Sequence, residues 1–241
     1  MHSHDILIAL FAFLSELLGT LSGFGSSSFF VPLAALFEKF TTVLFLTALL
    51  HSFSNLVKIF LFRTHFTKDA ILKLALPSIL FTGLGAIATQ YVGSEWLYSV
   101  LAGFLILFSI FKLLDPKSFV IPSQVAVYLS AISGFLTGLI GTGGALRGLL
   151  LTALRLEKNQ FVAVSGVIDV GGDWLRLLIY IKHGYANWHQ WYQWPLLIIA
   201  AFLGISAGRF LLNKIPQHIF EKIVAVAILL SGLVIVFQKV I

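Results

Sequence analysis

Two stretches of this chain repeat one another at a fixed separation of 118 residues. Gly23 and Gly25 in the segment LSGFGSSSFFVPL recur as Gly141 and Gly143 in LIGTGGALRGLLL. The same separation, without a gap, aligns five further pairs of uncommon residues, which are His51 with Asp169, Asn55 with Asp173, Lys58 with Arg176, His65 with His183 and Pro77 with Pro195. Two related halves that each contain a glycine-broken apolar segment are typical of secondary transporters, whose substrate binds between the halves.

The composition predicts that both halves lie in a membrane. Hydrophobic residues make up 59% of the 241 residues and charged residues only 11%, whereas soluble domains carry about 25% charged residues. A bilayer-spanning helix needs about 20 mostly apolar residues. We therefore expect an all-α polytopic membrane protein with a first repeat at 1–118 and a second at 119–241. The glycine-broken segments are 5–37 and 123–154, and the other spans are 41–62, 70–92, 95–114, 159–182, 190–212 and 217–238.

The distribution of positive charge predicts how the two long segments lie. Each has about 32 residues, and could cross the bilayer once or enter and return as a hairpin. If both cross, the 13 Lys and Arg residues in loops or at segment ends divide 7 to 6 between the two faces, and if both are hairpins they divide 10 to 3. The positive-inside rule favours the hairpins. Each half then has one hairpin and three spans, so the halves are inverted repeats, both termini lie outside, and the hairpin tips can meet near the midplane.

Charge and cysteine content exclude several other functions. The formal net charge of +6 would suggest nucleic-acid binding in a soluble protein, but here most Lys and Arg flank apolar segments. We therefore expect the lipid bilayer as the surroundings, a bacterial plasma (inner) membrane as the location, and no nucleic-acid partner. The chain contains no cysteine, which excludes disulfides and thiol chemistry, and we expect neither a cofactor nor a resident metal ion.

The glycine breaks are candidate anion sites. A half-helix that starts after a break exposes free N–H groups and the positive end of its dipole. Ser26 and Ser27 would begin one such helix, and the residues from Gly144 to Arg147 would begin the other. Glycine in an apolar helix more often allows close helix packing, but two breaks at related positions favour binding. The predicted substrate-binding residues are Gly23, Gly25, Ser26, Ser27, Gly141, Gly143, Gly144 and Arg147.

The glycine spacing also carries a family resemblance. The second copy has Gly134, Gly138, Gly141, Gly143 and Gly144, and the first retains Gly23 and Gly25 with Pro32 after them. In this repeated motif, and in length and layout, the chain resembles the TauE/SafE sulfite exporters and related anion transporters (TSUP). The resemblance implies transport of sulfite, an organosulfonate or another sulfur oxyanion. The chain departs from the motif at Glu16, Thr20, Ser26, Ser27, Ala145 and Leu150.

Ionisable residues within membrane spans mark pathways or relays by default. Arg147 is the candidate for pairing with an anion, because its planar fork matches an oxyanion; alternatively it is a structural partner of Glu16 or of an aspartate. Lys58 and Arg176 could draw anions into two vestibules, or reach the headgroups with their charged ends. Arg176 is also spaced to neutralise Asp173.

A second group could couple transport to protons. His51 and Asp169 occupy equivalent mid-span positions, and an axis in the membrane plane could bring them together as a titratable pair; a lone buried histidine can also simply satisfy a carbonyl. Asn55 and Asp173 lie one turn further along the same faces. Glu16 could carry a proton or cap a helix.

Three other functions are alternatives to proton-coupled anion transport. An intramembrane enzyme is not expected, because no HExxH motif is present and the single GxSxG match, at residues 204–208, lies inside the apolar span 190–212 rather than at a strand-to-helix turn. A passive anion channel could use the same glycine tips, without coupling to a gradient. A metal or cation transporter would require acidic or histidine clusters at its site.

Overall fold

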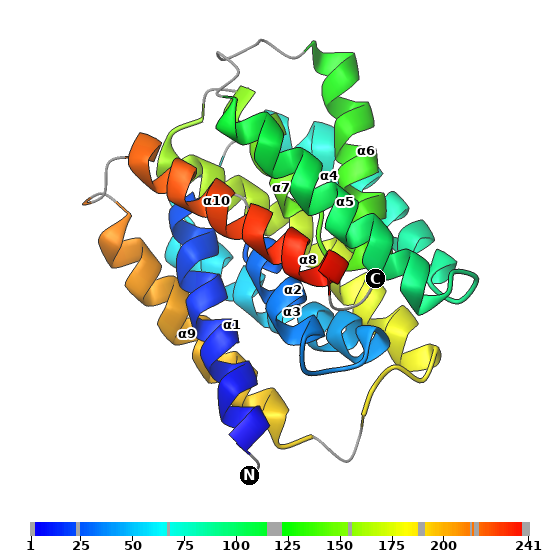
Figure 1. Ribbon diagram of the computed structural model, residues 1–241. Helices are drawn as coiled ribbons and strands as arrows, with labels where there is room; N and C mark the ends of the chain where they lie inside the picture. The colour runs from blue at the N-terminus through cyan, green and yellow to red at the C-terminus, as the bar shows by residue number, and fades with distance from the viewer. Residues whose placement is uncertain are drawn as a thin grey trace.

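The computed structural model describes residues 3–22, 25–66, 68–114, 122–153, 156–187, 191–212, 214 and 217–237. Within these ranges the chain forms ten α-helices and no strand (Figure 1). This confirms the predicted all-α fold. The helices are α1 Ser3–Ser22, α2 Ser27–Ala35, α3 Phe40–Leu61, α4 Lys68–Ala88, α5 Ser94–Leu113, α6 Ser123–Ile140, α7 Gly144–Ala153, α8 Lys158–Lys182, α9 Gln193–Leu211 and α10 Gln217–Ile235.

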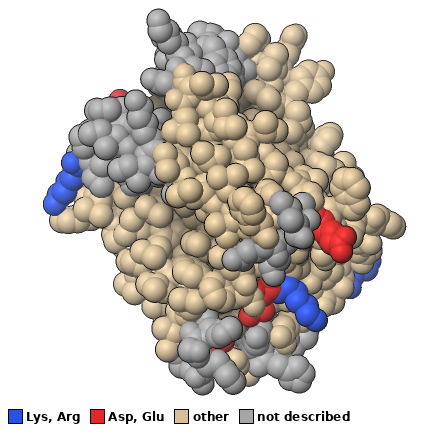
Figure 2. Space-filling view, viewed as in Figure 1, with Lys and Arg blue, Asp and Glu red and all other residues tan. Residues whose placement is uncertain are grey.

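The outer surface is apolar, as expected of a protein embedded in lipid. Five of the described helices contain stretches long and apolar enough to cross a bilayer, namely Asp5–Ser22, Phe40–Leu61, Ile71–Ala88, Ser94–Phe111 and Gln193–Leu211. On α4, Leu72, Leu76, Leu80 and Leu84 recur every fourth residue and are all exposed, which forms an apolar stripe on one side of the helix. Figure 2 shows a broad face of mostly uncharged residues, with the few visible charged side chains at its left edge and in its lower right part. The chain is therefore a multi-pass membrane protein.

The first glycine break lies between α1 and α2. Gly25 has a φ of 80°, a left-handed conformation that residues with a side chain rarely adopt. Beyond it α2 folds back along α1: a Cβ added to Gly19 would meet the backbone of Ser26, and the rings of Phe11 and Phe37 lie 5.7 Å apart. The two helices are thus antiparallel. Gly23, the other glycine expected here, lies outside the described residues.

The second glycine break lies between α6 and α7 and has the same form. Gly141 ends α6 with a φ of 78°, and α7 starts three residues later. Ser133 Oγ on α6 donates a hydrogen bond of 2.8 Å to the Gly143 carbonyl, and Arg147 on α7 donates one of 3.3 Å to Ser133 Oγ. Because residues beyond the turn return to residues before it, α7 runs antiparallel to α6.

The helices of the two halves interlock. On one side, Gln193 of α9 donates to Asp5 of α1 over 2.8 Å, and Gly208 packs on Thr20 further along both helices, so α1 and α9 are parallel. Elsewhere, α6 and α4 are also parallel; their contacts run from Ser130 with Leu74, through Gly134 with Ser78, to Gly138 with Thr82. Each helix that precedes a glycine break therefore packs on a helix from the other half.

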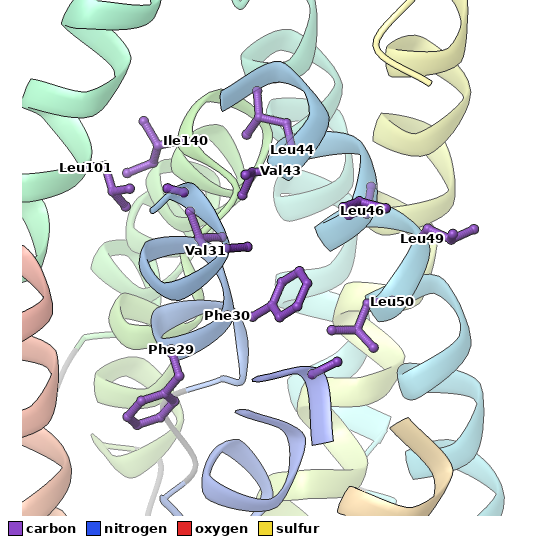
Figure 3. Packing of buried hydrophobic residues seen from close by; sticks show 14 of the residues in the cluster. Phe29, Phe30, Val31, Val43, Leu44, Leu46, Leu49, Leu50, Leu101 and Ile140 are labelled. Carbon is purple, nitrogen blue, oxygen red and sulfur yellow. The ribbon is translucent and has the colours of Figure 1, made fainter. Parts of the chain in front are cut away.

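The short helix α2 lies in the apolar interior. Phe29, Phe30 and Val31 are buried, and Figure 3 shows Phe30 extending toward Leu50 of α3, Val31 on the side of Ile140 of α6, and Phe29 pointing to another side of the helix. Irregular backbone at membrane depth is tolerated where protein or a wet cavity surrounds it. The burial of α2 provides these surroundings for the first break.

The largest difference from the expected spans is at α4, which ends at Ala88 rather than at 92. Thr89 Oγ1 donates to the Ala86 carbonyl over 2.6 Å. The backbone N–H groups of Gln90 and Tyr91 then bond three residues back, to Ile87 and Ala88. These tighter turns end the helix although Tyr91 and Val92 continue the apolar run.

Candidate functional site

The two glycine breaks meet. A Cβ added to Gly25 would lie 3.0 Å from the Cα of Gly144, and Ser28 Oγ lies 3.3 Å from Thr142 Oγ1. The N-terminal ends of α2 and α7 are therefore neighbours. Each end carries a partial positive charge, equivalent to about half an elementary charge, so the two together form an electropositive region of backbone.

A cavity opens beside this meeting point and contains most of the predicted site residues. It offers about 30 Å³ to the centre of a water molecule, which is more than the roughly 10–15 Å³ that one water requires. The cavity therefore suits a ligand of only a few atoms. The predicted residues that line it are Gly25, Ser26, Ser27, His51, Asn55, Lys58, Gly144, Arg147, Asp169 and Asp173.

Four predicted site residues lie close by without lining the cavity. Gly141 and Gly143 form the turn into α7 and pack on neighbouring helices. Glu16 and Arg176 are fully buried and contact the cavity through residues that line it. Their influence on a bound ligand would therefore pass through other side chains.

The sequence interpretation missed six residues that line the cavity. They are Gly19, Thr20, Thr137, Phe161, Val162 and Ser165. Two of them had a signal, because Gly19 and Thr137 are equivalent at the separation of 118 residues. Ser165 lies one turn before Asp169 on the same face of α8, as i and i+4 residues do. Thr20 is only 2% exposed and its Oγ1 has no hydrogen-bond partner among the described residues.

Arg147 is paired with a carboxylate in this structure. Its guanidinium forms an ion pair with Asp169 of α8, and its Nε has no hydrogen-bond partner among the described residues. Arg147 is 2% exposed, whereas the Asp169 side chain retains 16% exposure and accepts a bond of 3.3 Å from Ser165. The alternative expectation of an aspartate partner is thus met inside the cavity, where an entering anion would compete for the same guanidinium.

A second cluster surrounds Glu16 of α1, which is fully buried. Glu16 Oε1 accepts a hydrogen bond of 2.7 Å from Ser26 Oγ, and Ser26 Oγ lies 3.0 Å from His51 Nε2. Lys58 Nζ lies 3.1 Å from Glu16 Oε2. Two residues that line the cavity, Ser26 and Lys58, therefore contact this buried carboxylate directly, and a third, His51, reaches it through Ser26.

A third cluster lies where α3 crosses α8. Asn55 Nδ2 donates to Asp173 Oδ2 over 2.6 Å, so these two equivalent residues meet directly. Arg176 donates to Asp173 Oδ1 over 2.8 Å and to the Thr137 carbonyl over 3.2 Å, and Tyr180 donates to the Gly138 carbonyl. These two carbonyls lie in the last turn of α6, where a helix lacks its own donors. Arg176 thus neutralises Asp173, as its spacing predicted, and also caps α6.

His51 and Asp169 both line the cavity but have different partners. His51 is next to Ser26 and lies 3.8 Å from Glu16 Oε1, whereas Asp169 pairs with Arg147. Their action as one titratable pair stays a prediction.

The cavity has no excess of formal charge among these groups. Lys58 is paired with Glu16, Arg147 with Asp169 and Arg176 with Asp173. In the part of the chain that the structure describes, no group of three or more His, Asp or Glu side chains is placed to hold a metal ion. A ligand in the cavity could therefore bind to the two helix N-termini and to cations that are already paired with carboxylates.

Comparison with known protein families identifies the family of this chain. The family model described as Sulfite exporter TauE/SafE matches residues 8–235. The chain belongs to this family. The match confirms the resemblance inferred from the glycine motif, and because the TauE/SafE family is a family of transporters, the chain is a membrane transporter rather than an enzyme. No curated protein and no solved structure matches the chain.

Proposed function

We propose that this protein is a secondary transporter of a small oxyanion, with sulfite, an organosulfonate or another sulfur oxyanion as its substrate. The observation that carries the proposal is the convergence of two helix N-termini, those of α2 and α7, on one cavity that Arg147 also lines. Exposed backbone N–H groups and a guanidinium both favour oxyanions. Family membership makes sulfite the first substrate to test, and the small cavity favours a compact inorganic ion.

In the proposed complex, the anion lies between the two breaks and takes over the partners that the carboxylates now hold. Ser26, Ser27 and Gly144 would offer hydroxyl and backbone donors, and Arg147 would turn part of its fork from Asp169 to the anion. Gly141 and Gly143 would act indirectly, by setting the turn that brings α7 to the cavity. When no substrate is bound, Asp169 would hold the Arg147 guanidinium in place, and the anion would displace this carboxylate when it binds.

We also propose that the halves 1–118 and 119–241 are inverted repeats. The parallel packing of α1 on α9 and of α6 on α4 supports this arrangement, because one rotation would exchange the two helix pairs. The direct bond between Asn55 and Asp173 also supports it, since equivalent residues can meet only near the axis that relates them. Inverted halves around one central site are a common basis for alternating access. Both termini would lie outside, as the charge distribution predicts.

A passive anion channel remains the second candidate, because it could use the same helix ends. Coupling distinguishes the two functions. In liposomes containing the purified protein, a transporter should accumulate sulfite when a proton gradient is imposed, whereas a channel should conduct it at a rate that the gradient does not alter.

The experiment that tests the proposal begins with ligand-induced thermal stabilisation of the purified protein. Sulfite, thiosulfate, sulfonates, sulfate, carboxylates and divalent cations would be compared at equal concentration and ionic strength. We expect stabilisation by one or more sulfur oxyanions, because a ligand that binds only the folded state raises its stability. Stabilisation by divalent cations with no response to any oxyanion would contradict the proposal.

A further inference from the structure

The hydroxyl of Ser26 connects two titratable groups, and its geometry determines the direction of the hydrogen bonds. A serine hydroxyl has one proton to donate. Ser26 Oγ gives that proton to Glu16 Oε1 over 2.7 Å, so its contact of 3.0 Å with His51 Nε2 requires the imidazole to be the donor. The chain of donors therefore runs from His51 through Ser26 to Glu16.

We propose that Glu16 carries the proton that is coupled to anion transport, and that it receives this proton from the cavity through His51 and Ser26. His51, which lines the cavity, takes up a proton at Nδ1 and passes its Nε2 proton to Ser26 Oγ. Ser26 gives its own proton to Glu16 Oε1. Glu16 becomes a neutral acid that donates to Ser26 Oγ, Ser26 donates to His51 Nε2, and His51 ends neutral with its proton on Nδ1. The inference rests on the proposed anion transport.

The same hydroxyl links the proton to the anion. Ser26 directly precedes α2, yet its side chain makes no capping hydrogen bond to that helix; its hydroxyl contacts Glu16 and His51 instead. An anion at the α2 N-terminus that accepts the hydrogen bond of the Ser26 hydroxyl removes that donor from Glu16. Once protonated, Glu16 donates a hydrogen bond to Ser26 Oγ and needs none from it, so Ser26 can turn its proton from His51 Nε2 to the anion, and the protonated acid and the bound anion stabilise each other. Anion and proton should therefore travel together.

The charged groups around this relay lie on three helices. Lys58 of α3 contacts Glu16 directly, and Arg147 of α7 and Arg176 of α8 act electrostatically on His51. On the opposite side of α1, α9 presents Gly204 to Glu16. Protonation of Glu16 leaves Lys58 without its carboxylate partner, so the positive charge of Lys58 becomes available to an anion in the cavity.

The test compares two kinds of sulfite movement in liposomes that contain the purified protein. Exchange of labelled for unlabelled sulfite at equal pH on both sides requires no net proton movement. Accumulation under a pH gradient does, and one pH unit at one proton per anion sustains about a tenfold gradient, because one unit corresponds to a factor of ten in proton activity. Glu16→Gln should retain exchange and lose accumulation. Ser15→Ala is the matched control, since Ser15 is buried beside Glu16 and its Oγ has no hydrogen-bond partner among the described residues.

Two further variants keep the result decisive. Glu16→Gln leaves Lys58 as a buried cation without a carboxylate, which can impair folding, whereas Glu16→Gln combined with Lys58→Gln removes both charges. Because Lys58 lines the cavity, exchange by the double variant should be slower than in the wild type, but it should persist while accumulation is lost. Ser26→Ala keeps Glu16 but interrupts the relay, and should slow accumulation more than exchange. Full accumulation in the Glu16 variants would overturn the relay alone, as would parallel loss of both activities in Glu16→Gln and in the double variant. Absence of exchange and accumulation in the wild type would instead overturn the proposed transport of sulfite.

Discussion

The two glycine breaks carry their charges in different places. At the first break, Glu16 lies on the helix before the turn, and the equivalent residue at the second break is Gly134. At the second break, Arg147 lies on the helix after the turn, and the equivalent residue at the first break is Phe29. Each added charge has a local partner, Lys58 for Glu16 and Asp169 for Arg147. Related backbones thus carry opposite ionisable groups on either side of one cavity. We propose on this basis a division of roles, in which the first break holds the transported proton at Glu16 and the second supplies the cation Arg147 to an anion that lies between the breaks.

The largest effect should come from filling the second turn. A Cβ at Gly143 would overlap the Ser133 carbonyl of α6, and overpacking a tight site costs about 1–3 kcal/mol or more. We expect Gly143→Ala to lower thermal stability strongly. Gly25→Ala should lower it through its left-handed φ, by about 1–2 kcal/mol. Thermal unfolding in detergent measures both.

Gly103→Ala provides the control for these glycine substitutions. Gly103 lies within α5, and in the described part of the chain nothing approaches within 4 Å of its added Cβ. Alanine in a helix interior is favoured over glycine by about 0.5–1 kcal/mol, so stability should rise slightly. Equal losses at Gly103 and Gly143 would contradict the close packing of the second break.

The next effect tests whether the anion binds to Arg147 of the second break. Asp169→Asn removes the carboxylate that competes for Arg147, and hydrogen bonds to charged groups are worth about 1.5–3 kcal/mol. We therefore expect sulfite to bind on the order of tenfold more tightly in titration calorimetry. Ser165→Ala, which removes only the 3.3 Å bond to Asp169, should change affinity far less. Weaker binding by Asp169→Asn would mean that Asp169 positions Arg147 for the anion instead of opposing it.

The sequence predicted the fold class, the family and both glycine breaks, because apolar length, glycine spacing and the constant separation are local signals. It also predicted the Arg176–Asp173 pair and, as an alternative, an aspartate partner for Arg147, but it did not predict that Glu16 pairs with Lys58. Glu16 and Lys58 are not equivalent positions in the repeat, so their contact depends on how α1 and α3 pack. The bond between Asn55 and Asp173 is different, since the repeat makes these residues equivalent and equivalent residues can meet near the axis that relates the halves. The repeat did not determine which equivalent pair would meet, because His51 and Asp169 have different partners.

A smaller effect concerns the pH dependence of sulfite uptake, which should differ between variants of the two halves. Histidine titrates between about pH 5 and 8, and a glutamine at position 51 keeps hydrogen bonding without titrating. We expect His51→Gln to flatten the pH dependence of sulfite uptake over this range, while Asp169→Asn retains it. Flattening by both variants would favour the His51–Asp169 pair, and an unchanged response in both would remove these residues from coupling.

The smallest effect distinguishes how the two breaks are capped. Tyr180 donates to the Gly138 carbonyl, whereas the equivalent residue in the first half is Phe62, which packs under Arg209. Tyr180→Phe should cost about 0.5–1.5 kcal/mol, the usual net worth of one hydrogen bond. Thermal unfolding would detect the loss, and sulfite affinity should change little because the cavity lining is untouched. A large loss of affinity would show that the α6 cap controls the site.

Sulfite affinity of the Arg147→Gln variant tests most directly the claim that an anion binds where the two breaks meet. Titration calorimetry on the purified protein would compare it with Arg147→Lys and with Arg209→Gln, which removes the same charge from an exposed position. We expect Arg147→Gln to weaken binding on the order of ten- to a hundredfold, because a charge-assisted bond of about 1.5–3 kcal/mol is lost. Arg147→Lys should recover only part of the affinity, since a point charge lacks the planar fork, and Arg209→Gln should bind like the wild type. Affinity equal to the wild type in Arg147→Gln would contradict the account and leave Arg147 as the structural partner of Asp169.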